Sequence, residues 1–539
     1  MLSREAALAA LAQESFDVVV IGGGITGAGV ALDAASRGYS VALVERVDYS
    51  WGTSSRSSKL VHGGLRYLQN FDIGLVREAL LERQLLVKLA PHLVTPLQIL
   101  VPAFDGARRD RLTGIGLNMY DVMSTTRRRG EDDWSPARHR NVSGAEVLEL
   151  LPALAGRNPT GGYLFYDCQT DDSRLVLTVL EEAERFGAVC GSRLEVVELG
   201  REGVRVRDGE SGAELMVRAG AVINATGVWA DRIRPDELLS EAEVPRIRPS
   251  RGTHITLSSD DLPLVAGAIV PSGGGRFIFA LPWLGRTLLG TTDNNYEGDV
   301  DHVDPSIDDI DYLLDAVNTF FGKSLGHDDV TGAIAGVRPL ISSGDSKKSV
   351  DISRKAELYE TSSGMITITG GKLTTFRRMA QMAVDALVER DGRFAPCRTS
   401  EIPLGQPVAA DRLTRVDGVA EDAYEALADR YGHDAERVLA IAGERPEFAA
   451  AILQGFPDLL AEAVYAVRFE QARSLSDVLK RRTRLGLLAG RELCATGAVE
   501  PRVVASAIGA ELGWGAARVA DEVAHFQSGS GAVSRLTAA

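Results

Sequence analysis

The first residues in the chain whose types and spacing suggest a chemical function are three closely spaced glycines. Gly22, Gly24 and Gly27 form a GxGxxG pattern between an apolar run and a helical stretch rich in alanine. In such a turn the first glycine permits the sharp bend, the second lets the backbone approach a pyrophosphate, and the third allows close helix packing. Ile25 and Thr26 then begin a helix whose dipole and N–H groups favour a phosphate. The pattern predicts a dinucleotide site.

A glutamate sharpens this prediction. Residues 41–44 are a second apolar run, and Glu45 follows it directly. A carboxylate at this place accepts hydrogen bonds from ribose hydroxyls and repels a 2′-phosphate, which disfavours NADP. The motif does not distinguish FAD from NAD. The alternative interpretation is a glycine-rich turn in an α/β domain that binds no nucleotide.

Two further glycine-containing turns favour FAD. Ala225, Thr226 and Gly227 close an apolar run, as in the second nucleotide-contacting segment of flavoproteins with two dinucleotide-binding domains, although a strand meeting a loop explains them equally well. A glycine pair ending in Gly371 precedes the helical segment 373–387. The N-terminus of that helix would face the negative charge that reduced flavin gathers at its N1–C2=O edge.

Four cationic or titratable residues could act on a substrate. Arg338 lies in a short apolar stretch, where it either binds an anion or forms a buried ion pair. Arg66 follows two glycines and is otherwise a surface arginine before a helix. Lys372 could bind phosphate or a hydroxyl, or could be a solvated lysine at a helix start. His254 borders an apolar strand and is either a proton acceptor or a satisfied core histidine.

These residues require an α/β framework with a second, β-rich lobe. Apolar runs at 18–21 and 41–44 have the length of buried parallel strands. Between 253 and 292, β-rich runs separated by glycine and proline indicate an antiparallel or mixed sheet. Residues 398–410 contain two prolines and a glycine, which predicts a boundary, and residues 420–539 are rich in helix formers.

Composition limits the class of protein. The chain has 539 residues, enough for two or three domains, and its net charge of −15 disfavours a nucleic acid partner. Four cysteines without a CxxC pair argue against a zinc site or a disulfide framework, and favour a reducing, cytoplasmic compartment. We expect no metal site. The N-terminus lacks the features of a signal peptide, and no run reaches the ~18 apolar residues of a transmembrane helix.

Five blocks resemble the signatures of FAD-dependent glycerol-3-phosphate dehydrogenases, in the order typical of that family. They are GTSSRSSKLVHGGLRYL (52–68), YDCQTDDSRLVL (166–177), LGTTDNNYEGD (289–299), GVRPL (336–340) and GGKLTTFR (370–377). The segment LSDVLKRRTRLGLL (475–488) is similar to the family's C-terminal domain. The resemblance implies FAD as cofactor and oxidation of sn-glycerol 3-phosphate to dihydroxyacetone phosphate. It also implies a membrane quinone as electron acceptor.

The resemblance implies a fold as well. It is α/β with an α+β second lobe, in which a Rossmann-type FAD-binding domain joins a β-rich substrate domain like that of D-amino-acid oxidase and a helical C-terminal domain. Residues 1–400 would form the FAD-dependent region and 401–539 the helical domain. The FAD-binding parts would be 14–90, 160–235 and 330–395, and the substrate lobe 91–159 and 236–329.

Roles for individual residues follow from the same resemblance. The substrate would be surrounded by Arg66, Tyr67, His254, Arg338 and Lys372. Oxidising C2 requires its hydroxyl to lose a proton, and a base with a pKa near the working pH suits this step. His254 is the first candidate for that base and Lys372, with a lowered pKa, the second. Besides the first glycine motif and Glu45, the expected cofactor residues are Thr53, Ser54, Lys59, His62, Gly63, Gly64, Ala225, Thr226, Gly227, Gly371, Lys372, Leu373 and Thr374.

Two positions depart from the family pattern. Arg251 stands where relatives often carry lysine, which retains the positive charge. Val228 stands where proline is common and changes only the stiffness of the backbone.

A membrane quinone requires docking at a bilayer surface. Basic residues at 108–111 and 127–129 flank the apolar stretch LTGIGLNMYDVM, a pattern that suits an anionic membrane. A core-packed helix with solvated ends explains the same pattern. A second basic run at 480–484 is expected to be a helix face. We expect peripheral attachment to the inner face of the cytoplasmic membrane, and a homodimer is possible.

Three other functions compete with this one. A soluble glycerol-3-phosphate oxidase would pass the electrons to O₂, but the insertion such relatives carry before the helical domain is missing near 390–410. An amine or amino-acid oxidase of the same fold would use arginine for a carboxylate. A non-catalytic flavin-binding or RNA-modification partner protein would not need the cationic residues.

Overall fold

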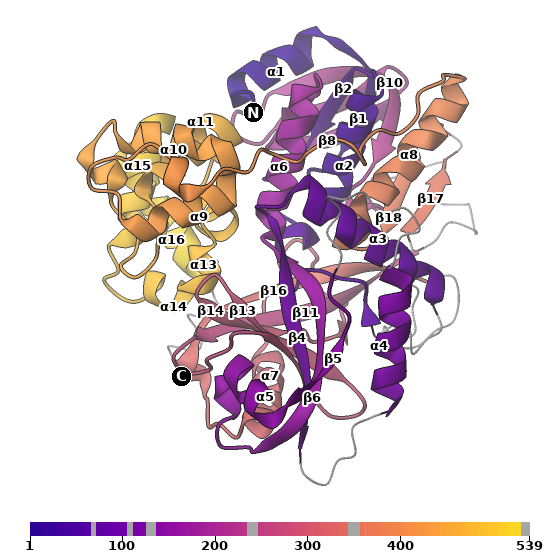
Figure 1. Cartoon of the computed structure of the whole chain (residues 1–539). Helices are drawn as coiled ribbons and strands as arrows, with labels where there is room; N and C mark the ends of the chain where they lie inside the picture. The colour runs from indigo at the N-terminus through magenta and orange to yellow at the C-terminus, as the bar shows by residue number, and fades with distance from the viewer. Residues whose placement is uncertain are drawn as a thin grey trace.

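The computed structural model describes residues 1–65, 72–104, 111–124, 136–233, 246–342, 356–361 and 363–529. Arg66 and Tyr67 lie outside these ranges. Figure 1 shows an α/β lobe at the top, a β-rich lobe beneath it, and a helical domain beside both.

A mainly parallel sheet forms the α/β lobe, with the strand order β17-β18-β10-β1-β2-β7. Helices α2, α6 and α8 pack on one face, where they bury Val18 and Val20, and α1 and the β8–β9 hairpin cover the face that holds Val19 and Ile21. Burial on both faces explains why the strands are apolar throughout. The bounds are α1 (Arg4–Gln13), β1 (Ser15–Ile21), α2 (Ile25–Ser36), β2 (Val41–Val44), α6 (Asp172–Arg185), β7 (Val189–Gly191), β8 (Leu194–Gly200), β9 (Gly203–Asp208), β10 (Glu214–Asn224), β17 (Ala356–Glu360), β18 (Ile366–Gly370) and α8 (Phe376–Asp391).

A second, mainly antiparallel sheet forms the other lobe, with the order β15-β11-β14-β13-β12-β4-β6-β3, in which β16 pairs with β11 and β5 with β6. Helices α5 and α7 pack on one face, and α3 and α4 on the other. The bounds are β3 (Leu60–Val61), α3 (Ile73–Leu89), β4 (Val94–Phe104), α4 (Arg111–Ser124), β5 (Arg140–Ser143), α5 (Gly144–Leu150), β6 (Pro159–Thr170), β11 (Arg246–Ser258), β12 (Gly267–Pro271), β13 (Phe277–Trp283), β14 (Arg286–Gly290), β15 (Asn294–Asn295), α7 (Ile307–Phe321) and β16 (Val330–Ser342).

The fold class expected from the sequence is confirmed, and the strand runs at 18–21 and 41–44 are both present. The β-rich region between 253 and 292 forms antiparallel pairs among β11, β13 and β14. The lobe ranges differ from the expected ones, because β6 and β16 both lie in the second sheet. Their sequences mark them as strands, but a strand pattern carries no information about which sheet it joins.

The helical domain contains α9 (Glu421–Tyr431), α10 (Ala435–Ala442), α11 (Leu460–Glu470), α12 (Leu475–Asp477), α13 (Leu485–Leu488), α14 (Gly490–Leu493), α15 (Glu500–Leu512) and α16 (Ala516–Ser528). Between α12 and α13 the backbone forms a π-helix, Val478–Arg482. The helix predicted at residues 480–484 is present in part, because residues 480–482 lie in this π-helix, but Arg481, Arg482 and Arg484 are all buried. Their charges are matched by carboxylates that lie elsewhere in the sequence.

Candidate active site

A cavity of about 600 Å³ lies between the two sheets. One part of its wall comes from the turns that follow β1, β2 and β10 in the parallel sheet. Another part comes from β11 and β16 of the second sheet, and includes His254 and Arg338. A cavity of this volume accommodates an organic cofactor together with a small substrate.

The glycine turn after β1 is built for close backbone approach. Gly22 has a φ of 111°, and a Cβ there would lie 2.8 Å from the carbonyl oxygen of Ala225. A Cβ on Gly27 would lie 1.9 Å from the carbonyl oxygen of Gly22, so Gly27 serves the contact between helix and strand. Gly24 caps α2 and lines the cavity, and the N–H of Ile25 donates to Ser54 Oγ at 2.9 Å. Any larger side chain here would fill the place that a pyrophosphate needs.

Glu45 lies at the end of β2 and lines the same cavity. Its carboxylate accepts the N–H of Gly23 at 2.7 Å and the N–H of Val47 at 2.8 Å. Burial raises the pKa of Glu45, and these two backbone donors oppose that effect. The carboxylate is therefore held beside the glycine turn, where the ribose of a dinucleotide would lie.

The other two predicted turns meet the first one at the cavity. Ala225, Thr226 and Gly227 follow β10, the parallel neighbour of β1, and all three line the wall. The segment after β18 contributes Gly371, Lys372, Leu373 and Thr374. The hydroxyl of Thr374 lies 3.1 Å from the N–H of His62, which ties this segment to the loop after β3. Three segments far apart in sequence thus form one continuous wall.

Most of the predicted cofactor residues line the cavity. Those that do are Gly22, Gly24, Ile25, Thr26, Glu45, Thr53, Ser54, His62, Gly64, Ala225, Thr226, Gly227, Gly371, Lys372, Leu373 and Thr374. Gly27 and Gly63 lie behind the wall, where Gly63 leaves room for Leu80 and Tyr120. The expectation for Lys59 needs correction, because its ammonium is fully buried and lies 2.7 Å from a carboxylate oxygen of Asp172. A buried lysine needs such a partner, and burial makes it a structural residue here.

His254 is the best-placed proton acceptor in the cavity wall. The side chain is almost fully buried, and its Nε2 lies 2.9 Å from Ser58 Oγ. Burial, with the positive charges of Lys59 and Arg338, holds the pKa of His254 well below its usual value. The imidazole is therefore neutral near neutral pH, as an acceptor must be. Its ring packs against Gly290, where a Cβ would lie 2.1 Å from His254 Cδ2.

Arg338 lies on β16, next to the strand that carries His254. Its Nη2 donates to Thr291 Oγ1 at 2.9 Å and to the carbonyl oxygen of Thr292 at 3.1 Å. Asp293 lies 3.6 Å away, and 23% of the Arg338 side chain is exposed. Arg338 therefore has an ion-pair partner and also lines the cavity, and anion binding by this arginine stays a prediction.

Of the three other predicted substrate residues, the structure describes only one. Lys372 lines the cavity directly after the glycine pair. Arg66 and Tyr67 lie outside the described residues. Arg251, which stands where relatives often carry lysine, pairs through its Nε with Asp309 at 3.1 Å and donates through Nη2 to Ser306 Oγ.

Several wall residues were not predicted. Arg56 lines the cavity, where burial and then the charge of Arg481 lower its pKa to about 10, so it stays cationic at neutral pH. Trp51 and Trp229 stack at 5.4 Å, and Arg46 lies 5.5 Å from both rings. Arg56 falls inside the block at 52–68, so its charge was a usable signal. The tryptophan pair gave none, because its members are distant in sequence. Within the described ranges, no group of three or more potential metal ligands occurs.

Comparisons with known sequences cover most of the chain. Residues 17–385 match the family described as FAD dependent oxidoreductase, and residues 370–519 match the C-terminal domain of alpha-glycerophosphate oxidase. The chain is 39% identical over 532 residues to glycerol-3-phosphate dehydrogenase 2 of Mycobacterium tuberculosis, which covers 96% of this chain and 88% of that protein. The mitochondrial glycerol-3-phosphate dehydrogenase of Arabidopsis thaliana is 38% identical over 526 residues, covering 90% and 81%.

A solved structure shares the whole architecture. The glycerol-3-phosphate dehydrogenase of Bacillus halodurans, complexed with FAD, aligns with a TM-score of 0.77 and 30% identity. The alignment covers 99% of this chain and 97% of that one, so it includes both lobes and the helical domain.

Proposed function

The chain belongs to the family of FAD-dependent glycerol-3-phosphate dehydrogenases, and we propose that it oxidises sn-glycerol 3-phosphate to dihydroxyacetone phosphate in the cavity between its two sheets. One observation carries the proposal. A single cavity has a wall of glycine turns that suits a nucleotide. The same cavity holds a buried, neutral histidine and, on the neighbouring strand, an arginine that faces the cavity.

The residues of the parallel lobe fit FAD. Gly22 permits the tight turn after β1, Gly24 lines the cavity where a pyrophosphate would approach, and Glu45 is held where it can accept hydrogen bonds from a ribose. Thr53, Ser54, His62 and the segment at 371–374 would surround the rest of the cofactor. FAD, when bound, supplies the acceptor for the hydride that leaves C2 of the substrate.

His254 accepts the proton of the substrate. The C2 hydroxyl gives its proton to the imidazole as its O–H bond breaks, and the electrons of the C2–H bond leave as hydride, so C2 becomes a ketone. Ser58 orients the ring through His254 Nε2. Burial, and then the positive charges of Lys59 and Arg338, lower the pKa of His254. A phosphate dianion beside Arg338 would offset that charge and make the imidazole a stronger base.

The cations of the wall provide the phosphate site. Arg338 can offer a guanidinium edge to a phosphate, and Lys372 and Arg56 add positive charge to the same cavity. Arg66 and Tyr67 remain proposed substrate contacts on the basis of the family resemblance. An amino-acid oxidase would bind a single carboxylate in this cavity, and one negative charge requires fewer cations than a phosphate dianion does.

Anaerobic titration tests the proposal. Adding sn-glycerol 3-phosphate to the yellow, FAD-loaded protein should bleach the flavin absorbance, and glycine or D-alanine should leave it unchanged. Bleaching by an amino acid, with none by glycerol 3-phosphate, would reject the proposal. The same preparation, exposed to a soluble quinone or to O₂, identifies the acceptor, because an oxidase would convert each turnover into hydrogen peroxide.

We also propose that the electrons go on to a membrane quinone and that α4 attaches the protein to the bilayer. One face of α4 packs into the β-rich lobe through Leu117 and Tyr120. The other face exposes Ile115, Met119 and Val122 by 58%, 40% and 72%. None of the described helices combines the length and the hydrophobicity needed to span a bilayer. An exposed apolar stripe at helical spacing suits insertion at the interface. The basic residues at 108–110 and 127–129 lie outside the described residues.

A further inference from the structure

The loop that carries Ser58 is held in place from the helical domain. Arg484, which follows the π-helix, is 1% exposed. Its Nη2 donates to the carbonyl oxygen of Ser55 at 3.0 Å and to Asp172 Oδ1 at 2.8 Å. The same Asp172 accepts the N–H of Ser57 at 3.0 Å and the Ser57 hydroxyl at 2.7 Å. Arg484 therefore contacts one end of the segment 55–57 directly, at Ser55, and the other end through Asp172.

Asp172 is the centre of this arrangement and is completely buried. Lys59 donates to both of its carboxylate oxygens, at 2.8 and 2.7 Å. Although burial alone would raise it, the charges of Lys59 and then Arg484 hold the pKa of Asp172 below its usual value. The carboxylate thus stays ionised, and it serves two cations and two groups of Ser57 at once.

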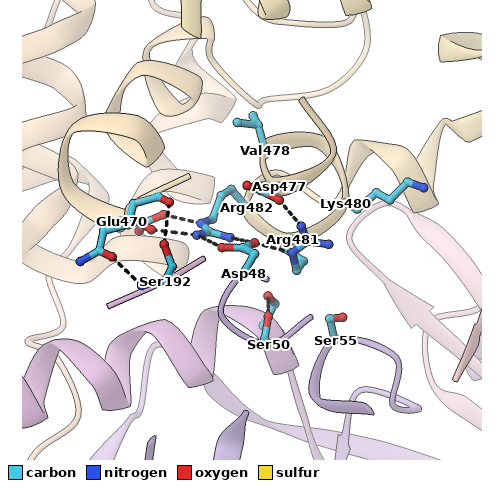
Figure 2. A network of polar contacts seen from close by, with 12 residues as sticks. Asp48, Ser50, Ser55, Ser192, Glu470, Asp477, Val478, Lys480, Arg481 and Arg482 are labelled. Carbon is cyan, nitrogen blue, oxygen red and sulfur yellow. Dashed lines mark hydrogen bonds and ion pairs between the residues drawn. The ribbon is translucent and has the colours of Figure 1, made fainter. Parts of the chain in front are cut away.

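The π-helix explains how an arginine of the helical domain reaches this loop. Figure 2 shows Arg482 between Asp48 and Glu470, with Arg481 reaching Asp48 and Asp477. These contacts anchor the π-helix to the loop after β2. Arg484 then adopts a φ of 66°, which arginine rarely does. Unusual backbone of this kind persists where surrounding contacts impose it, and π-helices often mark functional sites.

We infer that Arg484 is a positioning residue for His254. Its guanidinium and Lys59 hold Asp172, Asp172 and Arg484 hold the segment 55–57, and that segment sets the Ser58 hydroxyl 2.9 Å from His254 Nε2. A residue of the helical domain thereby governs the orientation of the proton acceptor in the cavity. The inference rests on the role proposed for His254 above.

Two variants test the chain of contacts at its ends. Ser58→Ala removes the hydroxyl at His254 and disturbs no buried charge. Arg484→Met removes one of the two cations that contact both the Ser55 carbonyl and Asp172, and leaves the other, Lys59, in place. Each should slow the limiting rate of anaerobic flavin reduction by about ten- to hundredfold, with little change in the glycerol 3-phosphate concentration at half-saturation, because a misplaced base weakens the chemical step. The double variant should be no slower than the slower single variant, because both act through one contact.

Hydrogen–deuterium exchange on the full-length, FAD-loaded protein gives a readout independent of activity. Arg484→Met should speed exchange in a peptide spanning 55–60, where the amide of Ser57 donates to Asp172 and the amide of Lys59 donates to Ser57 Oγ. Arg430→Met is the matched control. Arg430 is also buried and also pairs with two carboxylates, Asp458 and Glu462, but its contacts lie within the helical domain. It should lower stability and leave both the exchange at 55–60 and the reduction rate per flavin unchanged.

Arg484→Lys covers the case in which Arg484→Met does not fold. Lysine keeps the positive charge at Asp172 but lacks the planar guanidinium fork, so the reduction rate should fall between those of the wild type and Ser58→Ala. Wild-type reduction rates in both Ser58→Ala and Arg484→Lys would overturn the inference. If wild-type flavin is not bleached by glycerol 3-phosphate, the proposed function fails instead, and the exchange experiment still decides whether Arg484 holds the loop.

Discussion

Arg482 and Arg338 illustrate two environments for the same side chain. Arg482 is fully buried, and its guanidinium donates to both oxygens of Asp48, at 2.7 and 2.9 Å, and to Glu470 at 3.1 Å. Arg338 is 23% exposed to the cavity, and its carboxylate partner, Asp293, lies 3.6 Å away. Arg482 is surrounded by protein carboxylates, whereas Arg338 lies partly exposed in the cavity wall.

This difference separates structural arginines from ligand-binding ones. A buried cation that is fully compensated contributes to the folded state and has nothing left for an incoming anion. A cation that is partly exposed at a cavity wall can contact an incoming anion in addition to its protein partners. The comparison predicts that substitutions at the two places affect different quantities.

The largest effect is expected for Arg482→Met. Removing this guanidinium leaves Asp48 and Glu470 without their shared partner, which should lower the free energy of unfolding by about 3–5 kcal/mol. Urea denaturation followed by circular dichroism measures the change. Arg338→Met, examined side by side, should lose much less stability. Equal losses in the two variants would remove the distinction.

His254→Asn should abolish most of the chemistry and leave the fold intact. Asparagine can retain a hydrogen bond with Ser58 but cannot take the substrate proton, so the limiting rate of flavin reduction should fall about 10²–10⁴-fold. Stopped-flow absorbance under anaerobic conditions gives this rate. A reduction rate within a factor of about three of the wild type would move the role of base to Lys372.

Arg338→Met should act mainly on substrate binding. Loss of a charged hydrogen bond to phosphate should raise the half-saturating glycerol 3-phosphate concentration about 10- to 100-fold. Arg338→Lys should recover part of the affinity, because lysine keeps the charge without the planar fork. If binding is unaffected in both variants, Arg338 serves only its contacts with Thr291 and Asp293.

A smaller effect concerns how the stability of the ion pairs at the π-helix depends on pH. Although burial would raise it, the charges of Arg193 and Arg481 hold the pKa of Asp477 far below its usual value. The ionised carboxylate therefore stabilises the fold above the unfolded-state pKa of about 3.9, and this contribution is lost as the pH falls through the lower pKa of the folded state. Asp477→Asn should make the free energy of unfolding less dependent on pH below about 4. If the free energy of unfolding of Asp477→Asn falls with acid as it does in the wild type, a group other than Asp477 causes the loss of stability at low pH.

The smallest effect tests the membrane face of α4. Val122→Asp puts a charge into the exposed apolar stripe and should weaken flotation with anionic liposomes several-fold, with no change in flavin reduction in solution. Phe186→Asp is a control, because Phe186 is also exposed, by 42%, but lies after α6 in the other lobe. Equal flotation of both variants would point to a different docking surface.

Local features of the fold were predictable from the sequence, and remote partnerships were not. The strand, glycine turn, helix and Glu45 could be predicted because they lie in one continuous segment with a known spacing. The buried state of Arg482 could not, because Asp48 lies 434 residues away in the chain. The same holds for Lys59, whose partner Asp172 is 113 residues away. A sequence shows the charge of a residue but not its distant counterion.

One measurement tests the central claim most directly. Anaerobic single turnover with sn-glycerol 3-phosphate, followed by assay of the product, should give one equivalent of dihydroxyacetone phosphate for each flavin bleached. Arg338→Met should reach the same stoichiometry only at higher substrate concentration. If wild-type flavin stays oxidised at saturating glycerol 3-phosphate, or bleaches without forming the ketone, the cavity performs a different reaction.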